Sequence, residues 1–544
     1  MTDRAGIMAK LPPSGVPAGT LERKWESFSS KMPQLSPDRK RQCEIIVIGG
    51  GLAACAASVA LAEQGYSVRM ISSLESPLHE STTYMRGGIN AARNYANDGD
   101  SCDRFFRDTM EYGAWQSREA DTYRMAQLSG KVLDICAALC VPFIREPGGL
   151  LKPNRNPGGM TARSFQARGQ TGRQLLQAFY SAFLRHTANG NARLVWRREI
   201  TDICVYDGHA CGVVARNILN GNEETYSADV IVLACGGYSG IYNALPNIFY
   251  GGINPLWAAY RAGAAFANPC FSLKLPATAN RWRTVPEDYI SSQRCPGGLW
   301  VNYSLETTIP GLFAIGEANF SVHGANCMPG NAPLQELTDA IFIAPPAIGA
   351  YLARTGKKQS DIDKQLFSNA VSSSERHKER LFAINGKTPP QHLHTRLAEI
   401  MRDKVGFIRY SYRLQQALRE IRSLRQDFYS DLLLPRPSYY NIPYEIAFRT
   451  ANSLDLAELI VKDAILRKET CGAHFRMEYS SDGEKKEEKH YIRAWIRNGG
   501  KADIPFKEKL VFSDKDDNEP VHTFRKQNRS KTRKNSRKNI RPGR

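Results

Sequence analysis

Residues 44–71 read EIIVIGGGLAACAASVALAEQGYSVRMI, and this run predicts a strand, a helix and a second strand in succession. Glu44 to Ile48 is apolar and rich in β-branched residues, as is typical of a buried strand, and Tyr66 to Ile71 has a similar pattern. The alanine-rich stretch between them, which runs to Gln64, has the composition of a helix. The run therefore predicts a β-α-β unit in a doubly wound α/β domain.

The turn between the first strand and the helix has the spacing of a dinucleotide-binding motif, G-x-G-x-x-A. Gly49 permits the tight turn, Gly51 lets a pyrophosphate approach the backbone, and the small Ala54 lets the helix pack closely on the strand. The helix N-terminus then offers unpaired N–H groups and a positive dipole end to phosphate. Alone the motif is a moderate signal, because glycine-rich turns also occur without a ligand.

Two more predicted strands run into glycine. Short strands are expected at residues 194–196, 201–206, 212–217 and 226–235, with turns at Asp207-Gly208 and Asn220-Gly221. The last of them leads into Gly236, and a further strand at residues 312–315 leads into Gly316 and Glu317. Three strand-to-glycine junctions with an antiparallel β insert favour a large dinucleotide such as FAD over a single NAD site.

The pattern changes to helices beyond residue 401. Leu414, Leu418, Ile421 and Leu424 recur at helical spacing, as do apolar residues between 456 and 460. We therefore expect a C-terminal helical domain after the dinucleotide-binding domain.

Composition sets the class of protein. The chain has 544 residues, 42% hydrophobic and 23% charged, as in a folded protein of about three domains. No apolar run approaches the roughly 18 to 20 residues of a membrane span, and residues 1–40 lack the apolar core of a secretory signal. The expected location is intracellular, on the cytoplasmic or matrix side of a membrane and peripheral to it. Twelve cysteines without a C-x-x-C pair argue against zinc ribbons and cysteine-ligated iron–sulfur clusters, and predict reduced, mostly buried thiols.

The net charge of +19 is concentrated at the C-terminus. Residues 524–544 contain ten Lys or Arg and no acid, which is about half of the excess. Such a segment cannot build a core, and we expect a disordered basic tail. Two interpretations stay open: contact with nucleic acid or anionic lipid, and a solvated extension with no partner.

Seven short motifs together resemble one family of flavoproteins. They are GGINAARNY at 87–95, NDGDS at 97–101, ARGQTG at 167–172, ANPC at 267–270, GEANF at 316–320, HGAN at 323–326 and CGAHFR at 471–476. In order and spacing they resemble the flavoprotein subunit of succinate dehydrogenase and of quinol:fumarate reductase, from about Leu11 to about Gly500. The basic tail lies outside this resemblance.

The resemblance implies FAD as the cofactor and names the residues that hold it. The pyrophosphate is expected at the glycine-rich turn, the ribose at the end of the second strand, and the flavin ring and ribityl chain against the later motifs. In that order the expected cofactor-binding residues are Gly49, Gly51, Leu52, Ala53, Ser72, Gly87, Gly88, Gly236, Glu317, Asn331 and Leu334.

The residues that would bind flavin covalently and hold a dicarboxylate are replaced. Ser81 stands where the family has the histidine that bonds to FAD, so non-covalent FAD is expected. Leu275 and Gln293 stand at the two substrate histidines, and Cys327 at the substrate arginine. None of the three can carry the positive charge that a carboxylate requires. We therefore assign no catalytic residue and no metal ligand.

The chain is also too short for the family by one domain. Only residues 278–292 stand where the family inserts a capping domain, whereas an independently folded domain has on the order of 100 residues. The expected organisation is an N-terminal extension (1–42), a dinucleotide-binding domain in two parts (43–277 and 293–356), the remnant between them, a helical domain (357–500) and the tail-bearing extension (501–544).

Three functions are compatible with these residues. The first is an FAD-dependent subunit that interconverts succinate and fumarate and passes electrons to an iron–sulfur subunit held by a membrane anchor. The second is a degenerate paralogue with a structural or regulatory role, and the third is a flavoprotein oxidoreductase retuned to another substrate. Five losses confined to covalent-flavin and substrate chemistry favour loss of dicarboxylate catalysis.

Overall fold

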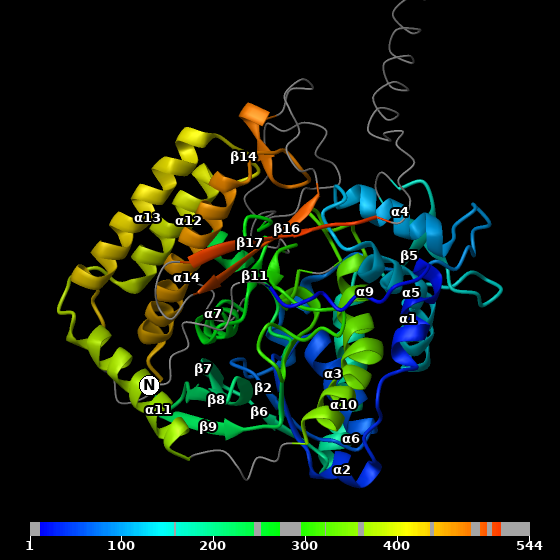
Figure 1. Ribbon diagram of the computed structural model, residues 1–544, viewed down its shortest axis with the longest axis horizontal. Helices are drawn as coiled ribbons and strands as arrows, with labels where there is room; N and C mark the ends of the chain where they lie inside the picture. Colours follow the sequence, from blue (N-terminus) through cyan, green and yellow to red (C-terminus); the bar gives the residue numbers. More distant parts are fainter. Residues whose placement is uncertain are drawn as a thin grey trace, which may run out of the picture. The chain divides into compact units, whose positions relative to one another are not determined.

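The computed structural model describes residues 11–156, 159–243, 252–272, 295–320, 322–356, 364–435, 440–479, 490–497 and 503–512 (Figure 1). The chain divides into two units, residues 1–510 and 511–544, and every helix and strand below belongs to the first. Leu275, Gln293, the segment 278–292 and the basic tail lie outside the described residues. Within the described ranges, no helix combines the length and apolarity needed to cross a membrane.

A five-stranded parallel sheet lies at the centre of the first unit. Its order is β13-β10-β1-β2-β6, with bounds Leu312–Ala314, Val230–Leu233, Glu44–Ile48, Ser67–Ile71 and Ala192–Val195. β1 pairs on both sides, and its residues from Ile45 to Ile48 are buried, which explains why they read as one apolar run. The predicted doubly wound α/β domain is confirmed.

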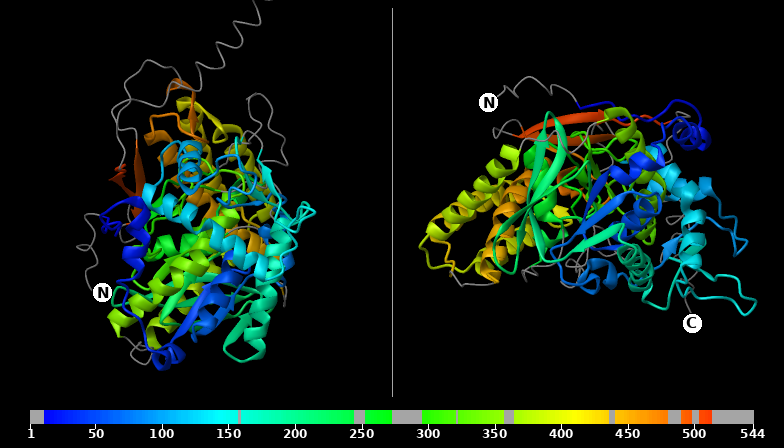
Figure 2. Two further views of the ribbon diagram at one scale, coloured as in Figure 1. Left: turned by 90° about the vertical axis from the view of Figure 1, so that its right-hand side faces the viewer. Right: turned by 90° about the horizontal axis from the view of Figure 1, so that it is seen from below.

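Helices pack against this sheet and against one another. α3 follows β1 and contacts α6, α9 and α10, and Figures 1 and 2 show these helices grouped beside the sheet. α4 and α5 pair with each other, and α1 packs on α5. The bounds are α1 Leu21–Ser29, α2 Pro37–Gln42, α3 Leu52–Glu63, α4 Cys102–Tyr112, α5 Glu119–Ala138, α6 Thr171–Ala188, α7 Ile253–Ala262, α9 Asn331–Thr338 and α10 Ala344–Thr355.

The predicted antiparallel insert is a three-stranded meander, β7 (Arg198–Tyr206), β8 (His209–Asn217) and β9 (Glu223–Ser227). The hairpin at Asp207-Gly208 has φ of 49° and 77°, as a two-residue turn between twisted strands requires. The prediction of a single strand at 226–235 was wrong. These residues form the end of β9 and all of β10, which belong to different sheets. The chain changes sheets at Asp229, whose carboxylate accepts the N–H of Glu44 at 2.8 Å.

The remaining strands form three small sheets. One is β3-β5-β4 (Ile89–Asn90, Ala162–Phe165, Pro153–Arg155), and another pairs β14 with β15 (Ile408–Arg409, Phe475–Arg476). The third is β12-β11-β16-β17 (Gly298–Leu299, Phe266–Ala267, Tyr491–Arg497, Asp503–Lys509). β16 and β17 were not predicted. They carry the chain back from the helices to β11, so the extension expected from residue 501 begins with an ordered strand.

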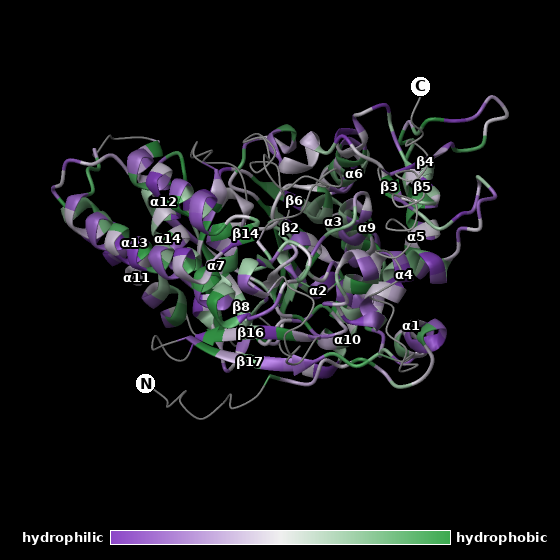
Figure 3. Cartoon of the chain, turned by 90° about the horizontal axis from the view of Figure 1, so that it is seen from above, coloured by the Kyte–Doolittle hydropathy of each residue, from purple (hydrophilic) through white to green (hydrophobic). Residues whose placement is uncertain are grey.

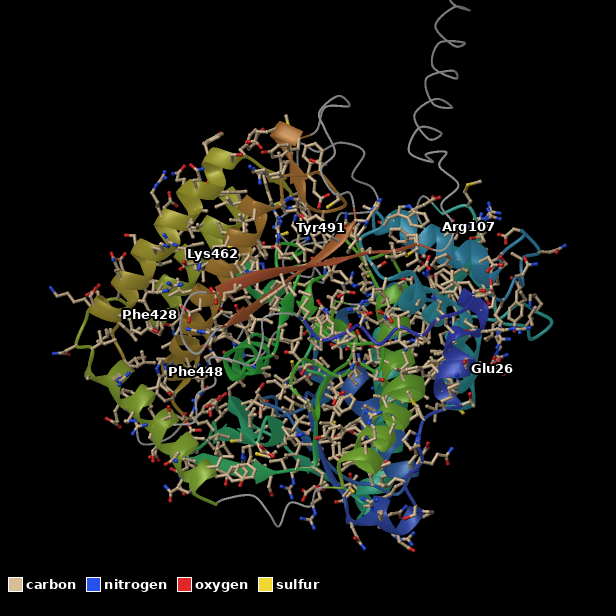
Figure 4. The ribbon with its side chains drawn as sticks, in the orientation of Figure 1. Glu26, Arg107, Phe428, Phe448, Lys462 and Tyr491 are labelled. Carbon is tan, nitrogen blue, oxygen red and sulfur yellow. The ribbon has the colours of Figure 1, made fainter. Side chains whose placement is uncertain are left out.

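The C-terminal helical domain is confirmed as α11 (Lys364–Ala383), α12 (Pro390–Lys404), α13 (Ser411–Asp431) and α14 (Ile442–Leu466). Leu414, Ile421 and Leu424 of α13 are buried at the predicted spacing, whereas Leu418 is partly exposed. Figure 3 shows the hydrophilic residues that cover much of α13. Lys462 of α14, labelled in Figure 4, forms ion pairs with Glu458 and with Asp503 of β17, which joins the helices to the last sheet.

Candidate functional site

Gly49 forms the sharp turn between β1 and α3. Its φ is +129°, and a Cβ at this position would lie 2.3 Å from the carbonyl oxygen of Ala234 at the end of β10. Its N–H donates to the Ile71 carbonyl of β2 at 2.8 Å. Both the backbone conformation and the close approach of β10 require glycine here.

The N-terminus of α3 follows directly, with Gly51 as its N-cap and Leu52 and Ala53 as its first residues. The Leu52 N–H points to the Thr82 hydroxyl at 3.4 Å. Ser72, at the end of β2, lies beside the turn, because a Cβ on Gly50 would be 3.0 Å from its Oγ. Three of the predicted cofactor residues and Ser72 are thus brought to one helix N-terminus, where backbone dipoles favour an anion.

A carboxylate that the sequence analysis did not single out lies against this turn. Glu80 Oε1 is 2.7 Å from where a Cβ on Gly50 would be, and its Oε2 is 3.7 Å from the equivalent point on Gly51. Burial and the charge of Glu336 raise the pKa of Glu80 to about 7, although a hydrogen bond from the Gly50 N–H opposes this shift. No spacing rule places Glu80 here, since it comes from the irregular chain after β2.

Gly236, Gly237 and Glu317 meet at the ends of β10 and β13. Gly236 has φ +78° and open space around its Cβ position, whereas a Cβ on Gly237 would lie 2.5 Å from Glu317 Oε1. The same carboxylate oxygen accepts the Cys295 N–H at 2.8 Å. The sequence placed two of these residues at separate strand ends, and the parallel sheet brings them to one edge.

A buried hydrogen-bond network holds the turn that carries Glu317. Asp339 Oδ2 accepts the Gly316 N–H at 3.0 Å and the Asn319 Nδ2 at 3.1 Å, while Gln335 Nε2 donates to the Gly316 carbonyl at 3.0 Å. Asp339 begins a π-helical turn, Asp339–Ile343, between α9 and α10. Burial raises the pKa of Asp339 to about 6, against the effect of these donors.

Asn331 and Leu334 lie on the first turn of α9. Asn331 Oδ1 accepts from Asn90 Nδ2 at 2.8 Å, and its own Nδ2 donates to Thr109 at 3.1 Å. Leu334 is fully buried. The contacts of Asn331 hold α9 against β3 and α4.

Gly87 and Gly88 precede β3 and have different surroundings. Gly87 has nothing within 4 Å of its Cβ position, whereas a Cβ on Gly88 would lie 2.1 Å from Ser164 Oγ on β5. Open space at Gly87 fits a residue beside a ligand. The close approach at Gly88 is a packing requirement.

The replaced positions differ in exposure. Ser81 begins a short 3₁₀ turn and is exposed. Cys327 is 1% exposed, with its Sγ near the Met328 carbonyl at 3.6 Å. Arg86 is exposed.

His474 and Arg476, which could be mistaken for a catalytic pair, are buried among hydrogen-bond partners of the helical domain. His474 Nε2 donates to the Arg467 carbonyl at 3.0 Å, and its Nδ1 accepts from Arg409 at 2.7 Å. Burial and the adjacent arginines lower the pKa of His474 well below its usual value. Arg476 donates to the Ala464 carbonyl at 2.6 Å. A neutral, fully bonded imidazole is a packing element.

A cavity of about 580 Å³ lies away from the glycine-rich turn, between β7, α7, α11 and α14. Its lining includes Arg261, Arg376, His377 and Arg380. It belongs to the insert and the helical domain, so it is not the site expected for a dinucleotide.

The residues around the turn fit FAD. The Gly49 turn, the free end of α3 and the open space at Gly236 and Gly87 suit an extended dinucleotide along the carboxyl edge of the sheet. Glu80 is the feature that conflicts with a pyrophosphate, since its carboxyl lies against Gly50 and Gly51 of the turn where the phosphate is expected.

Comparison with family models gives two matches. A model described as an FAD binding domain matches residues 44–279 and 286–332, and one described as the fumarate reductase flavoprotein C-terminus matches residues 394–533. The first match begins at β1 and ends in the first turn of α9, and the second covers most of α12 and all of α13 and α14.

Curated proteins of similar sequence include flavoprotein subunits of succinate dehydrogenase and of fumarate reductase. A succinate dehydrogenase flavoprotein subunit of Bacillus subtilis is 25% identical over 538 residues, which cover 80% of this chain and 91% of that protein. A fumarate reductase flavoprotein subunit of Haemophilus influenzae is 22% identical and covers 84% and 92% of the two chains.

Solved structures show the same fold. An E. coli quinol fumarate reductase superimposes with a TM-score of 0.76 at 17% identity, covering 87% of this chain and 98% of that one. A chain of the Mycobacterium smegmatis Sdh1 complex gives 0.75 at 18% identity, with 87% and 95% covered.

Proposed function

Because the chain belongs to the flavoprotein family of succinate dehydrogenase and fumarate reductase, with FAD as its cofactor, we propose that it is an FAD-binding subunit that has lost dicarboxylate catalysis. When bound, FAD supplies a two-electron acceptor at its ring. In this proposal the flavin is held without a covalent bond, because Ser81 has no imidazole to form one.

The observation that carries the proposal is the buried thiol of Cys327. It directly follows the His323–Asn326 motif and is 1% exposed, at the position where the family resemblance implies a substrate arginine. A neutral thiol offers neither the charge nor the paired N–H donors that hold a carboxylate. Removal of one such charge-binding donor typically costs a reaction about 3 to 4 kcal/mol.

The length of the alignment supports the loss of the capping domain. The match to the Bacillus subtilis subunit runs over 538 positions but takes up only 80% of this chain. About 100 of those positions therefore have no residue of this chain opposite them. That total equals the size of one domain, and a site without its cap would exclude water poorly.

An assembly with an iron–sulfur subunit and a membrane anchor is part of the proposal, as is the alternative of a flavoprotein with a different substrate. The first rests on family membership. The second is favoured by the replacement of charged substrate ligands with neutral ones, of which Cys327 is the described example. A substrate for such a site would be less anionic than succinate.

The test is a flavin spectrum and a turnover assay on one preparation of the full chain. We expect FAD absorbance after purification, release of the flavin into the supernatant on acid precipitation, and no reduction of an artificial acceptor by succinate. A Bacillus subtilis-type subunit, assayed in parallel, serves as the active control. Flavin that stays with the acid precipitate, or succinate turnover near that of the control, would contradict the proposal.

A further inference from the structure

Glu80 lies where the backbone of the glycine-rich turn is exposed for an anion. Its two carboxyl oxygens approach Gly50 and Gly51, and the Gly50 N–H forms a hydrogen bond with it. These are the backbone groups that a pyrophosphate uses in a G-x-G-x-x-A turn. The carboxylate and the cofactor therefore compete for one set of donors.

A second carboxylate, that of Glu336, helps to raise the pKa of Glu80. Glu336 on α9 is 5% exposed and lies beside the start of α3, because a Cβ on Gly316 would meet both its Cγ (3.0 Å) and the Ala53 Cβ (3.3 Å). Its charge acts on Glu80 and disfavours ionisation there. A negative charge nearby favours the protonated form of a carboxyl group.

The other groups around Glu80 do not neutralise it. Ser72, Thr82 and Trp196 supply two hydroxyls and an indole ring beside the turn. Cys55 of α3 and Cys235 after β10 are thiols whose pKa values are raised first by burial and further by Glu80, and Glu317 acts on Cys235 in the same way. The described groups that shift the pKa of Glu80 include no lysine or arginine.

We propose that Glu80 is a proton-controlled gate on the FAD pyrophosphate site. With the carboxyl protonated, the turn accepts the pyrophosphate; with it ionised, the negative charge repels the cofactor and occupies its donors. FAD affinity then falls as the pH rises. The proposal rests on FAD binding, which is part of the proposed function, and adds a residue that controls it.

The expected size of the effect follows from the titration of one carboxyl. The pKa of Glu80 is raised to about 7, so binding that requires the protonated form weakens about tenfold between pH 6 and pH 8. The pyrophosphate diester of FAD does not titrate in this interval, so the change would report the protein.

The experiment measures FAD dissociation constants for the apo full chain from pH 6 to pH 8, by quenching of flavin fluorescence. Glu80→Gln has nearly the same size without the charge, and Glu80→Ser also removes the bulk. Glu63→Gln, at the exposed far end of α3 and about 17 Å from its start, is the matched control. Circular dichroism verifies that each variant is folded.

We expect the affinity of the wild type and of Glu63→Gln for FAD to fall about tenfold from pH 6 to pH 8. Both Glu80 variants should bind FAD with little pH dependence, and at least as tightly as the wild type does at pH 6. A wild-type affinity independent of pH would overturn the gate while leaving FAD binding intact. Tighter binding by Glu80→Ser but not by Glu80→Gln would assign the effect to bulk and also overturn it. Failure of every variant to bind at any pH would overturn the assignment of FAD itself.

Discussion

Arg118 and Glu508 form a two-pronged ion pair between residues 390 positions apart in the sequence. Arg118 Nε lies 2.7 Å from Glu508 Oε1, and its Nη2 lies 2.8 Å from Oε2. Trp300 Nε1 also donates to this carboxylate at 2.8 Å. Burial opposes ionisation, but the Arg118 guanidinium holds the pKa of Glu508 below its usual value. The pair joins β17, the last strand among the described residues, to the N-terminus of α5.

Glu508→Ala should destabilise the protein by about 3 kcal/mol, because it leaves the buried Arg118 guanidinium without its main counter-charge. The change is measured as the shift in free energy of unfolding in urea. Asp427→Ala breaks the half-exposed Arg396 pair and should cost less than about 1 kcal/mol. Equal effects of the two substitutions would show that β17 adds no stability through this pair.

Gly49→Ala should abolish FAD binding and destabilise the apo protein by more than about 2 kcal/mol, since a Cβ cannot fit 2.3 Å from the Ala234 carbonyl. Gly65→Ala is the control variant that separates backbone strain from steric collision of the added methyl group. Gly65 also has a positive φ, +92°, but nothing lies within 4 Å of its Cβ position. It should lose about 1 to 2 kcal/mol and keep FAD binding. The measurements are urea unfolding and flavin titration.

Gly87→Ala should leave the free energy of unfolding unchanged, because its φ is not positive and its Cβ position is open. If Gly87 lies beside the flavin ring, as the resemblance implies, the added methyl group should weaken FAD binding about tenfold or more. Calorimetric melting of the apo protein and flavin titration separate the two effects. Unchanged FAD affinity would place the ring elsewhere.

Asp339 should make stability depend on pH in a defined direction. Burial raises its pKa in the folded state to about 6, above the ordinary 3.8, so its proton is held more tightly by the folded protein. Its contribution is fully present below pH 4 and is lost as the pH rises to about 6, by about 3 kcal/mol. Asp339→Asn should remove this slope. A variant that keeps the wild-type slope in urea unfolding between pH 4.5 and 7.5 would refute the assignment.

His394 should act in the opposite direction. It is buried, its Nε2 donates to the Asn243 carbonyl at 3.0 Å, and burial lowers its pKa to about 4. The unfolded chain therefore takes up a proton between pH 6.5 and 4 that the folded chain does not, and stability falls by up to about 3 kcal/mol as the pH falls through this range. His394→Gln should reduce that loss. The acid limb of a Tm against pH curve measures it.

The local pattern predicted the elements with strong periodicity. The apolar run Glu44–Ile48, the glycine-rich turn and the helical spacing of α13 each depend on neighbours in sequence, and the structure confirms them except at the partly exposed Leu418. The predicted strand boundaries were less accurate where the chain passes from one sheet to another without a change in composition, as at Asp229 between β9 and β10. β16 was missed, although it pairs with β17 over seven positions; its two pairs with β11 join it to residues more than 200 positions earlier.

The sequence by itself determined that this chain builds a dinucleotide-binding α/β domain and a helical domain of a flavoprotein family, because glycine spacing and apolar periodicity are local properties. By resemblance, it also predicts neutral residues at the positions where the family holds a dicarboxylate. Only the tertiary structure decided what surrounds the glycine-rich turn. Glu80 and Glu336 are 256 residues apart, and Glu336 can act on the pKa of Glu80 because α9, which carries it, packs against α3. Electrostatics depends on distance in space, which no sequence pattern records.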